Sequence, residues 1–594
     1  MIKDVLSPLN LIQEEAVHST EGPLLILAGA GSGKTACMTH RVAYLIKEKL
    51  VSPEHILCIT FTNKAANEMK ERIIKLVGKA PPFTGTFHSL CAKILRKYGH
   101  HIGIDPHFVI YDQTDQIEAV KKAMDDLGIS KKQVSPRSAL VSISSAKNEL
   151  ITEKEYPQYV RGVFQETVAR IYLQYTKILQ KNRALDFDDL LSQTVFLFQK
   201  HKEVLDTYAT QFQYILVDEY QDTNHAQYLL TKLLASRWKN IAVCGDDDQS
   251  IYAFRGADIK NILDFEKDYP NCKVLKLEQN YRSTKTILEA AYMVIRQNRN
   301  RKEKRLWTQN SQGNPIRLFQ GQNEIDEANF ITQTVLSTQL PLSSYAVLYR
   351  TNAQSRTIEE SLLKTGLPYI LVGGTKFYER KEVKDVLSYL RLLLNPSDRL
   401  SEERVLKIGK SRFNQFLELQ KNINVDTCSA LEALDRILSS TEYLSLLENG
   451  TEEGETRIEN VKELRSVASQ FTSLVSFLEN VSLVEQEYLP EHPSNGEKKE
   501  AIQLMTLHAA KGLEFPIVFM IGMEEGLFPH SRSLLDPNEL EEERRLCYVG
   551  LTRSKEDLYL TYARNRLYFG SRMTSMLSRF VEDIPKEFIA TIET

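Results

Sequence analysis

The sequence predicts an α/β protein with two parallel-sheet cores, each interrupted by a mostly helical insertion. Short apolar, β-branched runs alternate with helical patterns in the first half of the 594-residue chain, and a second such set follows in the other half. Two long stretches between these runs carry only helical periodicity. Because strands that alternate with helices favour parallel pairing, we expect sheets with helices on both faces.

The strands of the first core are expected at residues 24–27, 56–61, 214–217 and 241–244. Those of the second core are expected at 345–349, 369–372, 517–521 and 558–562. All eight runs are short and apolar, as buried strands of a parallel sheet usually are.

Helical spacing marks both insertions. Phe164, Val168, Ile171, Tyr175 and Ile178 recur every three or four residues, as do Leu431, Leu434 and Ile437. Residues 486–499, with the sequence QEYLPEHPSNGEKK, indicate an exposed linker. We therefore expect the first core at 1–105 and 186–277 with an insertion at 106–185, and the second core at 278–392 and 500–594 with an insertion and linker at 393–499.

Composition excludes several protein classes. The chain is 42% hydrophobic and 26% charged, with a formal net charge of −3, so any nucleic-acid contact must come from local basic patches. Its seven cysteines include no Cys-x-x-Cys pair, which argues for a reducing compartment and against zinc or iron–sulfur sites. No apolar run approaches about 18 residues and residues 1–10 do not resemble a signal peptide, so we expect a cytoplasmic protein without a membrane span.

The strongest motif lies at residues 28–35. The apolar run 24–27 leads into Ala28, Gly29, Ala30, Gly31, Ser32, Gly33, Lys34 and Thr35, and a helical pattern follows. This order is typical of a loop that binds nucleotide phosphates through backbone N–H groups. Lys34 would reach the β- and γ-phosphates of ATP and the Thr35 hydroxyl would bind Mg²⁺. Ala28 replaces the usual first glycine, and the alternative interpretation is a turn of small residues.

A pair of carboxylates follows another apolar run. Asp218 and Glu219 come directly after residues 214–217, so they are expected at the edge of the sheet where the strands end. Asp218 would hold Mg²⁺ and Glu219 would deprotonate the attacking water. The alternative is an acidic strand end that faces solvent.

The third motif spans residues 245–256. Gln249 can contact both a γ-phosphate and water, because an amide both donates and accepts hydrogen bonds. Tyr252, Phe254 and Arg255 follow it, and aromatic rings beside an arginine suit a single nucleic-acid strand. The alternative for the aromatic residues is packing in the hydrophobic core.

Further motifs stand in a fixed order along the chain: LNLIQ at 9–13, TFTNKAANEM at 60–69, GTFH at 85–88, DFDDL at 186–190, EQNYRS at 278–283, TLHAAKGLEF at 506–515 and EERRLCYVGLTR at 542–553. With the three motifs above, the chain resembles the superfamily-one DNA helicases of the UvrD/PcrA/Rep group over nearly its whole length. The resemblance implies two RecA-like P-loop cores, an ATP- and Mg²⁺-dependent activity, and ATP bound between the cores.

The resemblance also implies residue roles. Gln13 would read the adenine edge, Tyr281 would stack on the base, and Glu514 would hold the ribose. Arg282 and Arg553 would act as arginine fingers from the second core, since a planar guanidinium neutralises phosphate charge well. His508 would relay nucleotide state to DNA. The path of the single strand would be lined by Phe61, Asn63, His88, Tyr252, Phe254, Arg255 and Arg350.

By the same resemblance we expect an ATP-dependent 3′→5′ translocase and helicase in DNA repair or replication restart. Its partners would be single-stranded DNA, DNA junctions, and repair or replication proteins, and it would act as a monomer or a DNA-dependent dimer. The sequence leaves open a motor that mainly displaces proteins from DNA. Two further alternatives are weaker: the arginines of the second core argue against a small-molecule phosphotransferase, and Glu219 with Gln249 argue against an ATP-gated clamp without turnover.

The sequence departs from the family pattern in several places. Ala36 and Phe254 stand where relatives usually carry arginine and tryptophan, so we expect looser selectivity for the base and a smaller stacking surface. The insertion at 393–499 is expected to be shortened, and Lys407, Ile408, Gly409 and Lys410 resemble the remnant of a duplex-contacting loop. We also expect no C-terminal extension after residues 578–580.

Overall fold

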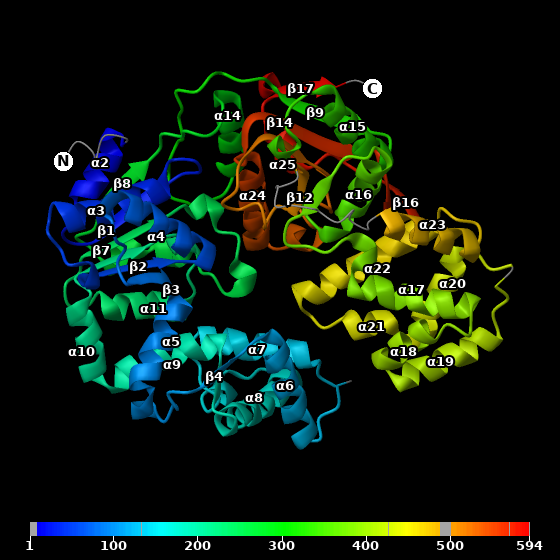
Figure 1. Ribbon diagram of the computed structural model, residues 1–594, viewed down its shortest axis with the longest axis horizontal. Coiled ribbons are helices and arrows are strands. Elements are labelled where there is room, and N and C mark those ends of the chain that lie inside the picture. Colours follow the sequence, from blue (N-terminus) through cyan, green and yellow to red (C-terminus); the bar gives the residue numbers. More distant parts are fainter. Residues whose placement is uncertain (1–8, 132, 426, 488–499, 569–570, 593–594) are drawn as a thin grey trace. The chain divides into compact units, whose positions relative to one another are not determined.

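Contacts between residues divide the chain into two units (Figure 1). The computed structural model describes residues 9–131, 133–425, 427–487, 500–568 and 571–592. Unit 1 comprises Met1–Arg282 and Arg299–Gln309, and unit 2 comprises Ser283–Asn298 and Asn310–Thr594. The chain thus leaves unit 1 after Arg282, a few residues later than the sequence boundary at 278 predicts, and returns to it for one short segment.

Unit 1 is built on a six-stranded parallel sheet with strand order β3-β2-β6-β7-β1-β8. The strands are β1 (Leu24–Ala28), β2 (Ile56–Thr60), β3 (Phe83–Thr86), β6 (Tyr214–Val217), β7 (Ile241–Gly245) and β8 (Lys273–Leu277). The helices of this core are α2 (Leu11–His18), α3 (Lys34–Lys47), α4 (Asn63–Val77), α5 (Phe87–Tyr98), α9 (Phe187–Lys200), α10 (Lys202–Gln211), α11 (His225–Leu234), α12 (Lys260–Leu263) and α13 (Phe265–Asp268). All four strands predicted for the first half are confirmed.

Alternate strand residues of this sheet face two separate hydrophobic clusters. Leu25 and Leu27 pack with α5, α9 and α11, whereas Leu24 and Ile26 pack with α3 and α4. Both faces are therefore covered, which explains why these strands are apolar along their whole length. Because the strands are parallel, the segments after β1, β6 and β7 all begin at the same edge of the sheet.

The first insertion of unit 1 is helical, as the spacing predicts. It contains α6 (Gln113–Asp126), α7 (Pro136–Asn148) and α8 (Val163–Lys181), which lie beside the short pair β4 (Val109–Tyr111) and β5 (Ala184–Asp186) (Figure 1). Asp186, from the 186–190 motif, caps α9 and accepts hydrogen bonds from Lys147 Nζ at 2.6 Å and the Tyr175 hydroxyl at 2.8 Å. This buried group fixes the insertion to α9, so Asp186 has a structural role here.

Unit 2 contains a seven-stranded parallel sheet with strand order β11-β12-β10-β13-β14-β9-β17. Its strands are β9 (Ile316–Gly321), β10 (Tyr345–Tyr349), β11 (Tyr369–Leu371), β12 (Ile502–Thr506), β13 (Phe515–Met520), β14 (Ser554–Ala563) and β17 (Ile589–Ile592), and a separate antiparallel pair is formed by β15 (Asn565–Tyr568) and β16 (Ser571–Thr574). The helices of this core are α14 (Lys285–Ile295), α15 (Glu324–Ser337), α16 (Ser355–Lys364), α24 (Pro537–Leu551) and α25 (Arg579–Glu582). The α/β class with two large parallel sheets is confirmed.

The second helical part belongs to unit 2. It contains α17 (Lys381–Leu394), α18 (Arg399–Ile408), α19 (Lys410–Lys421), α20 (Ala430–Thr441), α21 (Tyr443–Leu447), α22 (Glu452–Ala468) and α23 (Leu474–Glu487) (Figure 1). These helices share one hydrophobic cluster, to which α17 contributes Val386 and Leu390 and α20 contributes Leu434 and Ile437. Gly409, with φ at 156°, forms the corner between α18 and α19 and leaves Lys407 and Lys410 exposed. Of the expected linker, residues 486–487 end α23, and 488–499 lie outside the described residues.

Two expectations about composition can be compared with the structure. Among the described residues, no helix is both long and apolar enough to cross a membrane. The cysteines Cys37, Cys58, Cys91, Cys244, Cys272, Cys428 and Cys547 are all free thiols.

Candidate active site

The phosphate loop connects β1 to α3 at the edge of the sheet in unit 1. Gly31 and Gly33 have φ of 66° and 81°, a region that residues with a Cβ rarely adopt. Gly33 is the N-cap of α3 and no side chain caps this helix, so the N–H groups of its first turn are not taken by a cap. Such a helix start attracts anions, and the strand–loop–helix context that a phosphate site requires is present.

Neighbouring side chains hold the loop from its flank. Asn280 Nδ2 donates to the Ala30 carbonyl at 2.7 Å and the Tyr281 N–H donates to the Gly31 carbonyl at 3.0 Å. A Cβ on Gly31 would lie 2.6 Å from Asn280 Nδ2 and 2.8 Å from Arg282 Cβ. The structure therefore places Tyr281 and Arg282 beside the loop and within unit 1, whereas the sequence analysis assigned both to the second core.

Gln13 and Tyr281 lie close to the same loop. Gln13 Nε2 donates to the Ser32 carbonyl at 2.9 Å, and its Oε1 accepts from the Asn10 N–H at 3.0 Å in a capping box at the start of α2. Asn10 Nδ2 donates to the Tyr281 hydroxyl at 2.8 Å, and half of the Tyr281 side chain is exposed. An accessible aromatic ring beside a buried amide suits the binding of a nucleotide base.

Lys34 faces the carboxylates that follow β6. Its Nζ lies 3.3 Å from Glu219 Oε2. Burial alone would lower the pKa of Lys34, but the charges of Glu219, Asp246 and Asp218 raise it well above its ordinary value. Lys34 therefore stays charged, as contact with phosphate oxygens requires.

Asp218 is suited to hold a cation. Burial, followed by the nearby charge of Glu219, raises the pKa of Asp218 to about 7. A carboxylate whose charged form is disfavoured in this way gains from a cation beside it. Carboxylate and hydroxyl oxygens are ligands that Mg²⁺ accepts, so Asp218 fits this ion, and Thr35 in the first turn of α3 offers the hydroxyl.

Glu219 occupies an unusual backbone conformation. Its φ and ψ are 52° and 43°, the left-handed region that residues other than glycine, asparagine and aspartate seldom adopt. Strained positions of this kind cluster at functional sites. Its carboxylate accepts from Gln221 Nε2 at 2.7 Å, so its orientation is fixed by a buried amide.

Gln221 is a site residue that sequence reasoning missed. Its side chain is fully buried, donates to Glu219, and accepts the Asp246 N–H at 3.0 Å through Oε1. It therefore joins the segment after β6 to the segment after β7. The sequence did contain a signal for Gln221: it is an amide side chain, able both to donate and to accept hydrogen bonds, two residues after Glu219.

Gln249 lies in the segment after β7. Its Nε2 donates to Asp246 Oδ2 at 2.5 Å, and the residue is buried in the short helix η5 (Asp247–Gln249). The segments after β1, β6 and β7 thus bring together Lys34, Glu219 and Gln249, as predicted from their order in the sequence.

Aromatic residues form a platform in the same unit. Phe61 and Tyr252 stack with ring centroids 5.6 Å apart, and Phe254 meets Tyr252 edge-on at 6.0 Å. The Arg255 guanidinium lies 5.6 Å from the Tyr252 ring and 5.4 Å from the Phe254 ring. Phe254 is 49% exposed, so it is not part of the hydrophobic core. We call Phe61, Tyr252, Phe254 and Arg255 the aromatic platform.

Two further predicted strand contacts begin helices at this edge of the sheet. Asn63 is the first residue of α4 and is exposed; His88 is the second residue of α5. Burial lowers the pKa of His88, and its ring meets that of Phe187 edge-on at 5.7 Å. Phe187 is 46% exposed and was not singled out from the sequence, although it lies in the 186–190 motif.

The remaining predicted residues belong to unit 2. Arg350 pairs with Glu543, its Nη2 lying 2.8 Å from Oε1. Glu514 is exposed and lies 2.8 Å from Lys555 Nζ, and His508 follows β12. Arg553 is buried and donates to the Val549 and Leu513 carbonyls at 2.9 and 3.0 Å.

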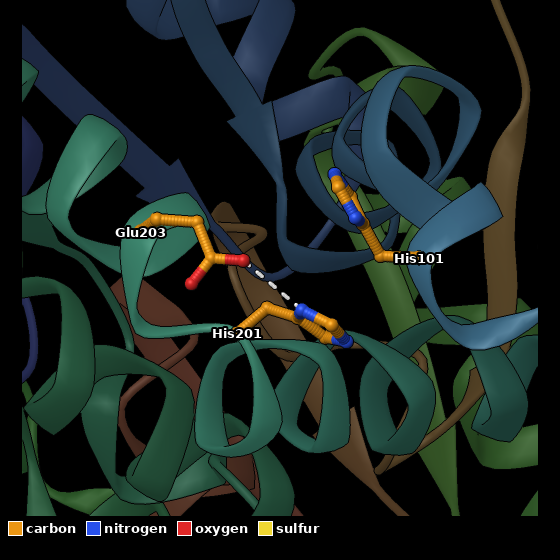
Figure 2. A group of neighbouring side chains, drawn as sticks. All are labelled: His101, His201 and Glu203. Carbon is orange, nitrogen blue, oxygen red and sulfur yellow. Dashed lines mark hydrogen bonds and ion pairs between the residues drawn. The ribbon is translucent and has the colours of Figure 1, made fainter.

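A group of metal-ligating residues lies outside this site (Figure 2). His201, between α9 and α10, donates from Nδ1 to Glu203 Oε1 at 3.0 Å, and its ring lies 5.0 Å from that of His101. The His101 ring also contacts that of His100 at 4.2 Å. All three drawn side chains are accessible to solvent, and these contacts account for the group as packing between the segment after α5 and the α9–α10 turn.

Family models and individual relatives both match this chain to UvrD-like helicases. The model of the UvrD/REP helicase N-terminal domain matches residues 9–270, and that of the UvrD-like helicase C-terminal domain matches 275–452 and 426–565. The chain is 47% identical over 644 residues to the ATP-dependent DNA helicase PcrA of Bacillus subtilis, covering 99% of this chain and 87% of that protein. It is 44% identical to the proteins of the same name from Staphylococcus aureus (strain Mu50) and Staphylococcus epidermidis, covering 98% of this chain and 87% of each.

Proposed function

Because this chain belongs to the UvrD/REP helicase family, we propose that it is an ATP-dependent DNA helicase that moves 3′→5′ along single-stranded DNA. The observation that carries the proposal is the position of two groups in unit 1. The hydrolysis residues Lys34, Glu219 and Gln249 and the aromatic platform follow strands of one sheet, and Tyr252 is three residues after Gln249. A change at the nucleotide can therefore reach the strand-binding surface through a very short stretch of chain.

The residues of unit 1 divide the chemistry among them. Lys34 and the backbone of the phosphate loop bind the phosphates, and Gln13 and Tyr281 hold the base. Glu219 takes the proton of the attacking water, since its carboxylate is already oriented by Gln221. Gln249 senses the γ-phosphate. Asp218 and Thr35 hold Mg²⁺, which neutralises charge on the phosphate oxygens when it is bound.

Arginine residues supply the remaining positive charge. Arg282, beside Gly31, and Arg553 of unit 2 stabilise the charge that develops on the transferred phosphoryl group. Glu514 binds the ribose and His508 relays nucleotide state. For Arg553, this role requires its guanidinium to release the carbonyl groups of Val549 and Leu513 that it contacts in the present structure.

The strand is held by stacking and by phosphate contacts. Bases stack on the aromatic platform, and Asn63, His88 and Arg350 contact the strand elsewhere. Stacking is indifferent to sequence because every base has a π-face, so we propose little sequence preference. ATP drives stepping only if its bound states differ in affinity for the strand.

We further propose that the two sheets with their insertions form the six segments expected from the sequence, apart from residues 278–282 and 299–309, which belong to unit 1, and that the second insertion is shortened. The alignment of this chain to the Bacillus subtilis relative spans 644 positions, more than the 594 residues of the chain, so this chain is shorter than the relative somewhere within the matched region. The partners would be single-stranded DNA, DNA junctions and repair or replication proteins, in the cytoplasm, with the protein acting as a monomer or a DNA-dependent dimer. An alternative within the same family is a motor that mainly displaces proteins from DNA.

ATP hydrolysis and strand displacement test this proposal together. Wild-type protein should hydrolyse ATP, single-stranded DNA should stimulate it, and a duplex with a 3′ tail should be unwound in preference to one with a 5′ tail. Lys34→Ala should lose at least about 10²-fold in turnover through the lost phosphate contact. Hydrolysis that ignores single-stranded DNA would contradict the proposal. Efficient removal of a protein roadblock without unwinding would favour the alternative.

A further inference from the structure

The segment Arg299–Gln309 returns to unit 1 between two stretches of unit 2. Its backbone is paired with residues that precede the unit boundary: the Asn280 N–H donates to the Trp307 carbonyl at 2.8 Å, and the Trp307 N–H donates to the Glu278 carbonyl at 2.9 Å. Lys276 Nζ donates to the Glu303 carbonyl at 2.6 Å. We call this segment the return segment. Its placement is fixed by main-chain hydrogen bonds, independently of any one of its side chains.

Three consecutive carboxylates meet the return segment. Asp246, Asp247 and Asp248, directly after β7, are all buried. Lys304 Nζ lies 2.9 Å from Asp246 Oδ1, 2.6 Å from Asp247 Oδ1 and 2.7 Å from Asp248 Oδ2. An ammonium group has three N–H donors, so one carboxylate oxygen is available for each. Lys304 itself is only 3% exposed.

Arg301 and the main chain of Lys302 also donate hydrogen bonds to these carboxylates. Arg301 makes a bidentate contact with Asp248, Nε donating at 3.0 Å and Nη2 at 2.8 Å. The Lys302 N–H donates to Asp247 Oδ2 at 2.8 Å. Buried carboxylates need such partners, because an unpaired charge away from water is costly. Asp247 and Asp248 therefore have two partners each on the return segment, and Asp246 pairs there with Lys304.

Asp246 also contacts the hydrolysis site. Its Oδ2 accepts from Gln249 Nε2 at 2.5 Å, while its Oδ1 accepts from Lys304 Nζ at 2.9 Å and from the Asp248 N–H at 3.2 Å. Its N–H donates to Gln221, which in turn donates to the Glu219 carboxylate. Asp246 thus connects the return segment to Gln249 through its carboxylate, and to the general base Glu219 through its main-chain N–H and Gln221.

We propose that Lys304 is a positioning residue for ATP hydrolysis, which fixes Asp246 and through it the amide of Gln249. This inference rests on the proposed function, because it takes Gln249 as the γ-phosphate sensor. Without the Lys304 ammonium, Asp246 Oδ1 keeps the neutral Asp248 N–H but loses its ion pair, so the carboxylate is held less firmly and can turn away from Gln249. The amide then no longer has one fixed orientation toward the phosphate.

A second contact of the return segment supports this role. The side chain of Leu306 covers the phosphate loop: a Cβ on Gly29 would lie 2.2 Å from Leu306 Cδ2. The return segment therefore contacts both the phosphate loop and the loop that carries Gln249. Both ends of the return segment continue into unit 2.

The test compares Lys304→Met with a matched control in the full chain. Methionine keeps the length of the side chain and removes the charge. We expect kcat of DNA-stimulated ATP hydrolysis to fall about tenfold or more, as for loss of a group that orients a catalytic residue, with KM for ATP within about twofold. The control is Lys302→Met. Lys302 lies on the same return segment, and the variant removes its partly exposed ion pair with Glu266, so kcat should stay at the wild-type value.

A double-mutant cycle separates positioning from stability. If Lys304 acts through Gln249, Lys304→Met should reduce kcat far less in a Gln249→Ala background than in the wild type. An equal factor in both backgrounds, or a rise in KM at constant kcat, would overturn the inference. A lower melting temperature alone would not produce the non-additive result.

A further variant covers the case in which Lys304→Met does not fold. Asp246→Ala removes the link to Gln249 but leaves Lys304 paired with Asp247 and Asp248, and it should reproduce the loss of kcat. Wild-type kcat in a folded Asp246→Ala protein would overturn the inference. If the wild-type protein itself shows no DNA-stimulated hydrolysis, the proposed function fails; if it does and these variants match it, only the role of Lys304 fails.

Discussion

Replacing Phe254 by alanine tests the aromatic platform most directly. The ring is 49% exposed, contacts Tyr252 edge-on at 6.0 Å, and has the Arg255 guanidinium 5.4 Å from its centroid. Stacking of one base on an aromatic side chain is worth about 1–3 kcal/mol. Since only half of the ring is accessible, we expect a loss of about 1–2 kcal/mol, which weakens binding of single-stranded DNA by about 5- to 30-fold.

The assay is a fluorescence-anisotropy titration of a labelled oligothymidine at fixed ionic strength, because salt alone changes such affinities strongly. Trp238→Ala is the matched control. Trp238 is a similarly exposed aromatic residue, at 42%, but it precedes β7 and so lies at the opposite end of the strand from the platform. We expect Trp238→Ala to leave the affinity unchanged, and Phe254→Trp to increase it through a larger stacking surface.

Protein stability provides an internal check. Deleting a buried phenylalanine costs about 3–5 kcal/mol, whereas the half-exposed Phe254 should cost clearly less. An unchanged affinity in Phe254→Ala, with Trp238→Ala also unchanged, would refute the platform as a binding surface. An equal loss in both variants would show that the effect does not depend on the platform.

Three further predictions follow from particular contacts. Glu219→Gln should bind ATP and DNA normally but stop hydrolysis, because glutamine keeps the shape and removes the base; residual turnover with lost ATP binding would contradict the assignment. Lys147→Met removes the positive charge that pairs with the buried carboxylates of Asp186 and Asp189, which should lower the free energy of unfolding by about 3–5 kcal/mol. Limited proteolysis should therefore cut within residues 106–185 at a lower urea concentration than in the wild type. Equal resistance to the protease would argue against Lys147 as the residue that fixes the first insertion. The double variant Lys407→Ala/Lys410→Ala should bind a 3′-tailed duplex more weakly but retain DNA-stimulated ATP hydrolysis. An unchanged affinity for the duplex would show that the corner at Gly409 does not contact DNA.

Substituting Lys407 and Lys410 tests whether the second insertion contacts duplex DNA more cleanly than deleting part of the insertion would. Removing residues 401–451 would take away Phe416, Leu434 and Ile437, which are buried against Val386 and Leu390 of α17. The loss of this shared hydrophobic cluster would affect the fold as well as any contact with duplex DNA. The exposed Lys407 and Lys410 can be changed without that effect.

The strands that the sequence predicted share a clear local signal. β1, β7 and β10 are uninterrupted apolar runs, because all of their residues are buried, on either face of the sheet. β8, with sequence KVLKL, and β3, with FTGT, were missed. Both lie at the edges of the first sheet, where lysine, threonine and glycine are tolerated and the apolar pattern weakens.

The positions of the candidate site residues in the fold were predictable from the order of the strands, whereas their roles stay predictions. Lys34, Asp218 and Gln249 each follow a predicted strand, and parallel strands end at one edge of the sheet. The position of Tyr281 and Arg282 in unit 1 was not predictable in this way. It depends on Asn280, which reaches back by 250 residues to the Ala30 carbonyl.

The burial of Asp246, Asp247 and Asp248 could not be predicted from the neighbouring sequence. A run of three acidic residues is ordinarily a solvated surface, and nothing within ten residues of it offers three buried donors. Burial of these carboxylates becomes possible only because Lys304, Arg301 and the Lys302 N–H arrive from a segment more than fifty residues away. That segment lies in the part of the chain expected to open the second core. Lys304, which contacts Asp246 and through it Gln249, is therefore supplied by the segment that crosses between the units, and its loss should lower kcat more than it raises KM for ATP.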